Sequence, residues 1–223
     1  MKPVVVMTQT SNIQSDLVEI VHKPFIQIQS LEFDTQLLHY NYDWLIFSSK
    51  NAVRLFYQYL DHINVKSIAA IGSKTARLCE ELGINVDFIP SDYSQEGLLK
   101  ELKVNQQTIL IPSSAKARPK LQQELAKNND VTKIDLYRPI AHHENIQDVI
   151  QLIKTNQVDA LTFSSSSAVR YYFNENIPSN FNDYYAIGSQ TAHTIKQYGY
   201  SPKIAKQQTL EALINKIVES RNL

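Results

Sequence analysis

The segment Phe47-Ser48-Ser49-Lys50-Asn51-Ala52-Val53-Arg54 recurs as Phe163-Ser164-Ser165-Ser166-Ser167-Ala168-Val169-Arg170, 116 residues farther along the chain. Gly72 of the segment Ile-Gly-Ser-Lys-Thr-Ala recurs as Gly188 of Ile-Gly-Ser-Gln-Thr-Ala, and Gly83 recurs as Gly199, both at the same offset. Because small and hydroxyl residues match at one constant spacing, the sequence indicates an internal duplication.

Each copy has the pattern of alternating strands and helices. Short runs rich in β-branched or aromatic residues predict buried strands at 4–7, 25–28, 44–47, 67–71, 108–111, 131–136, 160–163 and 185–187. Helical spacing predicts helices near 12–22, 51–60, 74–82, 94–103, 116–128, 145–155, 167–173, 190–198 and 208–220. Pro139 is expected to interrupt a strand shortly before a helix begins. This alternation indicates α/β architecture, with parallel sheets covered by helices on both faces.

The composition limits the classes of function. Of 223 residues, 43% are hydrophobic and 20% charged, which is typical of a globular protein. The formal net charge is zero, so no broad attraction to nucleic acid or to a membrane is expected. Cys79 is the only cysteine, which excludes a disulfide framework within the chain. The apolar run at 3–8 is too short for a signal peptide or a membrane span, so a cytoplasmic protein is expected.

Hydroxyl residues follow the predicted strands, at the end of a parallel sheet where ligands bind. These turns are Ser48-Ser49, Ser73–Thr75, Ser113-Ser114, Ser164–Ser167 and Ser189–Thr191. For any one turn, ordinary capping of the next helix is a sufficient explanation. For the whole set, backbone amides and hydroxyls at helix starts favour the binding of carboxylates or phosphates.

Other ligand-binding and catalytic motifs are missing from the sequence. There is no G-x-x-x-x-G-K phosphate loop, no dinucleotide fingerprint and no G-x-S-x-G nucleophile elbow. His142 and His143 are adjacent but lack the spacing of a metal site, so no metal is expected. Binding of a polar, anionic small molecule therefore remains the favoured function.

The chain resembles the uroporphyrinogen-III synthase family. The resemblance rests on an ordered set of segments that runs from about residue 4 to 218. They are Asp43–Val53, Ile71–Ala76, Pro90–Leu98, Asp135–Arg138, Asp159–Val169, Ala186–Ala192 and Thr209–Leu213. Each segment alone is common in α/β proteins, whereas the set in this order is specific.

The resemblance implies two flavodoxin-like α/β domains with parallel sheets, joined by a two-stranded connector, with the ligand cleft between them. Residues 1–30 and 143–223 would form a discontinuous domain and residues 31–142 an inserted one, with the connector near 28–34 and 137–143. It also implies a monomer that needs no metal or organic cofactor. The resemblance leaves open a transient contact with the enzyme that makes hydroxymethylbilane, the implied substrate.

The implied reaction is the closure of hydroxymethylbilane to uroporphyrinogen III, with inversion of ring D and loss of water. Tyr137 matches the family tyrosine proposed to help the hydroxyl leave; a protonated phenol can donate that proton. The substrate-binding candidates are Ser48, Ser49, Lys50, Ser73, Thr75, Ser113, Ser114, Arg118, Ser164, Ser165, Ser189 and Thr191. Lys50-Asn51 stands where some relatives carry Pro-Arg, and Lys50 or Arg54 could supply the missing positive charge.

Two other functions remain open on the sequence. A non-catalytic two-domain protein that closes on an anionic metabolite would keep the hydroxyl turns and would show no turnover. A flavodoxin-like regulatory module is disfavoured, because the acidic cluster that such receivers need after the first strand is absent.

Overall fold

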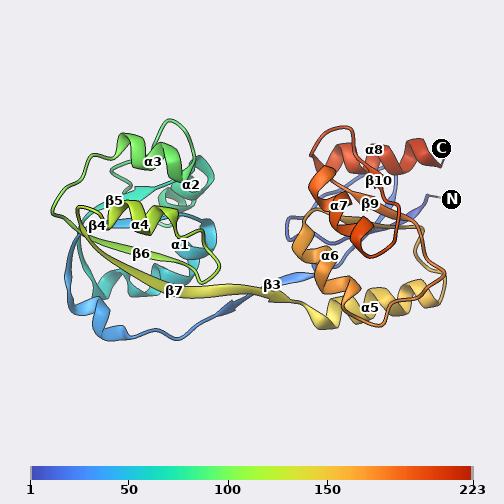
Figure 1. Ribbon diagram of the computed structural model, residues 1–223, viewed down its shortest axis with the longest axis horizontal. Coiled ribbons are helices and arrows are strands. Elements are labelled where there is room, and N and C mark those ends of the chain that lie inside the picture. Colours follow the sequence, from blue (N-terminus) through green and yellow to red (C-terminus); the bar gives the residue numbers. More distant parts are fainter. Residues whose placement is uncertain (1, 222–223) are drawn as a thin grey trace. The chain divides into compact units, whose positions relative to one another are not determined.

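The computed structural model describes residues 2–221, which divide into two compact units (Figure 1). Unit 1 comprises the chain up to Gln27 and from Ile140 onward, and unit 2 comprises Ile28–Pro139. Each unit contains a five-stranded sheet. Parallel strands flanked by helices, as the sequence predicts, are therefore confirmed.

The sheet of unit 2 alternates its side chains between two helical layers. Its strand order is β3 (Ile26–Ser30), β7 (Asp130–Ala141), β6 (Thr108–Ser114), β4 (Asn41–Phe47) and β5 (Asn64–Ala70). The pairs β4–β5, β4–β6 and β6–β7 are parallel. Leu45 packs with α1 (Lys50–Phe56) and α2 (Ser73–Glu81), whereas the next residue, Ile46, packs with α3 (Gln95–Glu101) and α4 (Lys120–Leu125). The two-residue period of a strand thus fills both cores.

Unit 1 is built in the same way around a second sheet. Its strand order is β10 (Lys203–Ile204), β9 (Tyr184–Ala186), β8 (Ala160–Phe163), β1 (Val4–Met7) and β2 (Glu19–His22), and these neighbours are parallel. One face is covered by α5 (His143–Lys154), α6 (Ser166–Phe173) and α7 (Ser189–Gln197). The other face is covered by α8 (Leu210–Ser220).

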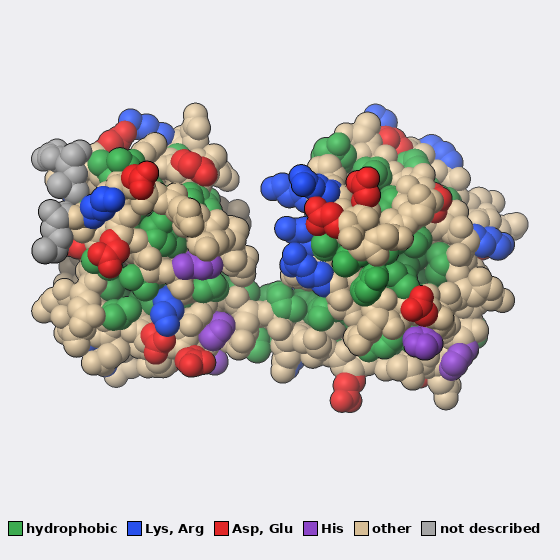
Figure 2. Space-filling model, turned by 180° about the vertical axis from the view of Figure 1, so that it is seen from behind, with side chains coloured by type: hydrophobic (Ala, Val, Ile, Leu, Met, Phe, Trp, Pro, Cys, Tyr) green, Lys and Arg blue, Asp and Glu red, His purple; other side chains and the backbone are tan. Residues whose placement is uncertain are grey.

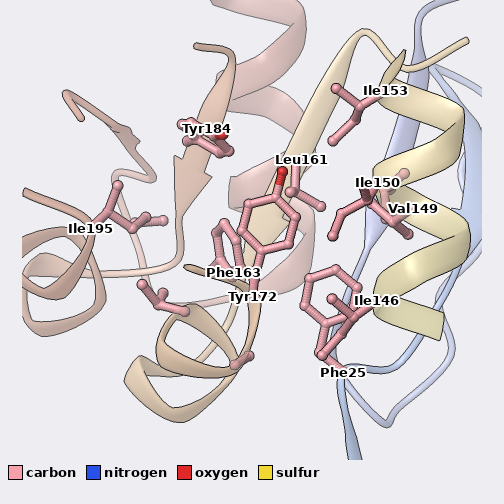
Figure 3. Close-up of a cluster of buried hydrophobic side chains, with 14 of the residues drawn as sticks. Phe25, Ile146, Val149, Ile150, Ile153, Leu161, Phe163, Tyr172, Tyr184 and Ile195 are labelled. Carbon is pink, nitrogen blue, oxygen red and sulfur yellow. The ribbon is translucent and has the colours of Figure 1, made fainter. Parts of the chain in front are cut away.

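Aromatic side chains fill the larger core of unit 1. The rings of Phe25 and Tyr172 stack with centroids 5.7 Å apart, and Phe163 packs against both, beside Ile146 and Ile150 of α5 (Figure 3). Burial raises the pKa of the Tyr172 phenol above its ordinary value, so that it stays neutral. Such stacked and edge-on pairs add to the stability that apolar burial gives.

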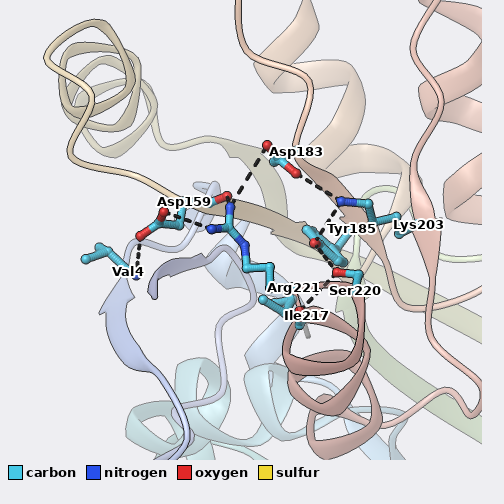
Figure 4. A network of polar contacts seen from close by, with 8 residues as sticks. All are labelled: Val4, Asp159, Asp183, Tyr185, Lys203, Ile217, Ser220 and Arg221. Carbon is cyan, nitrogen blue, oxygen red and sulfur yellow. Dashed lines mark hydrogen bonds and ion pairs between the residues drawn. The ribbon is translucent and has the colours of Figure 1, made fainter. Parts of the chain in front are cut away.

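A polar network ties the amino ends of the strands of unit 1 to the end of α8 (Figure 4). The Asp159 carboxylate accepts from Val4 N (2.8 Å) and from Arg221 Nη1 (2.9 Å). Lys203 Nζ donates to the Asp183 carboxylate (3.0 Å), and the Tyr185 hydroxyl lies 2.6 Å from Ser220 Oγ. This network lies at the opposite end of the strands from the hydroxyl-bearing turns.

Two segments of the described chain are short 3-10 helices, η1 (Thr35–His39) and η2 (Tyr57–His62).

The two repeats end equivalent helices in the same way. Gly83 and Gly199, which follow α2 and α7, have φ of 74° and 86°. In this left-handed region glycine is favoured because it has no Cβ, so both glycines end their helices.

Two predictions about secondary structure are wrong. A helix at 12–22 is not formed; instead Glu19–His22 is β2, an edge strand beside β1. Pro139 does not interrupt β7, which continues to Ala141. The last β6 residue, Ser114, pairs with Tyr137, so Pro139 lies past the β6 ladder, where a missing N–H costs no bond to that strand.

Candidate functional site

In unit 2, the order of the strands marks the position of a ligand site. From β4 the chain continues to the neighbouring β5 on one side, and from β6 to β7 on the other. Ligands of open parallel sheets bind at the carboxyl ends of the strands where this direction reverses. The turn Ser48-Ser49 follows β4, and Ser113 and Ser114 end β6, so both hydroxyl-bearing turns lie at this switch point.

A bulge between β6 and β7 determines where Tyr137 lies. Ser113 pairs with Asp135, but the next residue, Ser114, pairs with Tyr137, so Leu136 is an extra residue in β7. Strict alternation would place Leu136 and Tyr137 on opposite faces of the sheet. Both are buried in the same core, beneath α1 and α2, because the bulge turns Tyr137 toward that side.

The Tyr137 hydroxyl reaches the turn after β4. Its oxygen lies 2.8 Å from Ser49 Oγ, and either hydroxyl can donate. Ser49 also caps α1, because its Oγ accepts from Ala52 N at 3.1 Å. The prediction that these turns cap helices is confirmed for Ser49, whereas the binding of an anion by this turn stays a prediction.

The hydroxyls that end β6 have different surroundings. Ser113 is 2% exposed, and its Oγ has no hydrogen-bond partner within residues 2–221. Ser114 Oγ accepts from Lys116 N at 3.1 Å. Buried hydroxyls usually find a partner, so the Ser113 hydroxyl is an unused polar group beside the Tyr137 strand.

Basic side chains follow β6 immediately. Lys116, Arg118 and Lys120 are exposed. Arg118 and Lys120 both donate to Glu96 of α3, at 3.3 Å and 3.2 Å. Lys50, the first residue of α1, is also exposed. Elsewhere, acidic and basic side chains both appear on the face that Figure 2 presents, in keeping with the zero net charge.

The switch point of unit 1 lies between β1 and β8, and one of its turns was not predicted. Ser164–Ser167 follows β8, and Thr8–Ser11 follows β1. Thr8 Oγ1 donates to Thr162 O at 2.7 Å, and His22 Nε2 donates to Gln9 O at 2.7 Å, so both neighbouring strands hold this turn. The hydroxyl-rich run Thr8-Gln9-Thr10-Ser11 was the signal in the sequence, but it has no copy in the repeat.

The other predicted hydroxyls of unit 1 begin helices. Ser165 Oγ accepts from Ala168 N at 3.3 Å and caps α6. Ser189 is the exposed first residue of α7, and Thr191 is 5% exposed within its first turn. In unit 2, Ser73 and Thr75 hold the same two positions in α2, and Thr75 is 6% exposed.

Within residues 2–221 the structure contains no group of three or more His, Cys, Asp or Glu side chains that could hold a metal ion. His142 caps α5, and the adjacent His143 lies 2.9 Å from Glu175. Burial raises the pKa of the Cys79 thiol to about 11, so it is not a thiolate nucleophile at neutral pH. No helix of the described chain is long and apolar enough to cross a membrane.

Known proteins resemble this chain in sequence and in fold. Porphyrin biosynthesis protein HemD of Ruminiclostridium josui is 26% identical over 219 residues, which are 90% of this chain and 44% of that protein. The chain thus spans less than half the length of that relative. Uroporphyrinogen-III synthase of Synechococcus elongatus is 28% identical over 195 residues, 78% of this chain and 74% of that protein.

The fold agrees with a solved structure. The crystal structure of uroporphyrinogen-III synthetase from Helicobacter pylori 26695 superposes with a TM-score of 0.65 at 20% identity, covering 99% of this chain and 100% of that one. The profile of the family described as Uroporphyrinogen-III synthase HemD matches residues 10–215. This chain belongs to the uroporphyrinogen-III synthase HemD family.

Proposed function

We propose that this chain is a hydro-lyase of haem biosynthesis, which closes hydroxymethylbilane to uroporphyrinogen III with inversion of ring D and loss of water. The family match over residues 10–215 carries the proposal. The contact between Tyr137 and Ser49, at the switch point of unit 2, supports it, because the phenol lies where parallel sheets bind their ligands.

The substrate determines what the catalyst must do. Hydroxymethylbilane closes without help, but it then gives isomer I, in which ring D is not inverted. The enzyme must therefore favour attack by the substituted carbon of ring D, which is the more crowded route. Holding the two ends of the substrate in the geometry for this attack supplies much of the acceleration.

Tyr137 is the proposed general acid. Its phenol gives a proton to the substrate hydroxyl, the C–O bond breaks, and water leaves with the electron pair of that bond. The pyrrole nitrogen donates its lone pair, which leaves an azafulvene cation on ring A. The phenolate regains a proton when the closing ring carbon loses one, so the enzyme is unchanged. Acid catalysis of this kind contributes about 10² to 10⁴ in rate.

The hydroxyl-bearing turns are the proposed substrate-binding groups. Hydroxyls and backbone amides at helix starts bind carboxylates without a net positive charge on the protein. The residues assigned this role are Ser48, Ser49, Ser73, Thr75, Ser113, Ser114, Ser164, Ser165, Ser189 and Thr191. Lys50 and Arg118 add positive charge beside the turns of unit 2.

The proposed architecture has two flavodoxin-like domains joined by two strands, with residues 1–30 and 143–223 in one and 31–142 in the other. The strand order β2-β1-β8-β9-β10 supports the flavodoxin comparison. The boundaries between units, at Gln27/Ile28 and Pro139/Ile140, lie within β3 and β7, which supports the two-stranded connection. We assign the activity to a cytoplasmic monomer.

A turnover experiment tests the proposal. Purified protein is mixed with a large molar excess of hydroxymethylbilane, and substrate loss is followed against the spontaneous closure. The proposal expects many substrate molecules converted per protein molecule, faster than the blank. Saturable binding with a rate of loss equal to the blank would instead identify a binding protein.

A further inference from the structure

The Ser49 hydroxyl makes two contacts: it caps a helix, and it lies within hydrogen-bond distance of a tyrosine hydroxyl. Its oxygen accepts from Ala52 N at 3.1 Å, which caps α1, and it lies 2.8 Å from the Tyr137 hydroxyl. Ser165, at the same place in the second repeat, accepts from Ala168 N at 3.3 Å. The residue 116 positions before Tyr137 is Val21, in β2, which has no hydroxyl group. The repeat therefore supplies no second phenol at the equivalent position.

The hydrogen-bond inventory of these groups permits the direction that acid catalysis by Tyr137 needs. A serine hydroxyl has one proton and two lone pairs, and Ala52 N occupies one lone pair. The proton of Ser49 is then available to the phenol oxygen of Tyr137. With this arrangement the phenol keeps its own proton for another acceptor. A chain that runs from amide to serine to phenol also strengthens each bond in it.

Because Tyr137 is buried, the hydrogen bond from Ser49 to its phenol oxygen is stronger than it would be in water. Tyr137 is 6% exposed and packs under α1 and α2, so most of its side chain is removed from water. A buried phenolate without a donor is costly, whereas a hydrogen bond from Ser49 stabilises the negative charge. The bulge at Leu136 holds the two hydroxyls at this distance through the backbone.

We propose that Ser49 is a positioning residue: it donates to the Tyr137 oxygen, points the phenol proton away from the turn, and stabilises the phenolate left after proton transfer. This role rests on the proposed function and concerns the Ser49 side chain only; the substrate-binding role proposed for Ser49 then belongs to its backbone amide. The Ser49 hydroxyl therefore acts through Tyr137.

A double-mutant cycle tests this role. Ser49→Ala is expected to lower kcat about 10-fold or more, with KM changed less than about two-fold, as for loss of a hydrogen bond to a developing charge. In a Tyr137→Phe background the same substitution should have no further effect on kcat. Ser49→Thr, which keeps a hydroxyl and a helix cap, should restore most of the activity.

Ser165→Ala is the matched control, because it removes a helix cap from the equivalent turn and leaves Tyr137 untouched. Its effect on kcat should be the same in both backgrounds. The ¹³C chemical shift of the Tyr137 ring Cζ, which reports hydrogen bonding at the phenol oxygen, should change in Ser49→Ala and stay at its wild-type value in Ser165→Ala. This second readout needs no substrate.

The outcomes separate the two proposals. If wild-type protein forms isomer III but Ser49→Ala lowers kcat equally in both backgrounds, or leaves the ¹³C chemical shift of the Tyr137 ring Cζ unchanged, the positioning role is wrong and the proposed function stands. If wild-type protein forms no isomer III, the proposed function fails, and the positioning role fails with it.

Discussion

Ser114 of β6 pairs with Tyr137 of β7, although its neighbour Ser113 pairs with Asp135. This single shift in register puts Tyr137 in the core beneath α1 and α2, with its hydroxyl 2.8 Å from Ser49 Oγ. Without the shift, the phenol would face α3 and α4, on the other side of the sheet. The position of the proposed acid thus depends on one extra residue in a strand.

Replacement of Tyr137 by Phe removes only the hydroxyl. We expect kcat for isomer III to fall about 10²-fold or more, since the general acid is lost. The free energy of unfolding should fall by about 1 kcal/mol, the typical value for one hydrogen bond. Initial rates corrected for spontaneous closure, together with urea unfolding, measure both. An unchanged kcat would remove Tyr137 from the mechanism.

Thr191 and Thr194, both in α7, allow a substrate-binding role to be distinguished from a structural role. Both are 5% exposed, and Thr194 Oγ1 lies within hydrogen-bond distance of Ser166 Oγ (2.8 Å) and Gln190 O (3.1 Å). Thr191→Val should lower kcat/KM about 10- to 100-fold, as expected when a hydrogen bond to a carboxylate is lost. Thr194→Val should instead lower the free energy of unfolding by about 1 kcal/mol and leave kcat/KM unchanged. The reverse pattern would show that Thr191 has a structural role only.

Arg118 tests the contribution of charge. Arg118→Gln should raise KM about two- to five-fold, because an exposed ion pair contributes little, and the increase should shrink at high salt. Lys127→Gln is the matched control: Lys127 is equally exposed but precedes the amino end of β7 and pairs with Glu124. Equal effects of the two substitutions on KM would mean that only the net charge matters.

Asp43 makes stability depend on pH. The hydrogen bond from Lys66 (2.7 Å), followed by those from the Thr108 amide and hydroxyl, lowers the pKa of Asp43 to about 2. Because the folded-state pKa lies below the unfolded one, the stabilisation is complete above about pH 4. It is lost as the pH falls from about 4 to about 2. Thermal unfolding of Asp43→Asn should show a weaker dependence on pH across this window than wild type. Parallel curves would contradict this assignment.

The sequence predicts the repeated parts of the molecule well. The segments after Phe47 and Phe163 were expected to be turns at the carboxyl ends of strands, and both are. Capping hydroxyls and helix-ending glycines act locally, so their chemistry can be read from a few adjacent residues.

Features that depend on distant partners could not be predicted. The segment 12–22 has apolar residues at helical spacing, but pairing with β1 makes Glu19–His22 a strand, and short apolar runs do not distinguish the two. The bulge at Leu136 has no residue that marks it, because it depends on the register with β6. The contact between Ser49 and Tyr137, 88 residues apart, follows from that register and was equally hidden.

The isomer composition of the product tests the central claim most directly. Hydroxymethylbilane is incubated with the protein and with buffer alone, the products are oxidised to porphyrins, and isomers I and III are separated and quantified. We expect isomer III to predominate with the protein and isomer I with buffer. Isomer I as the only product in both would contradict the proposed function, whatever the affinity of the protein for the substrate.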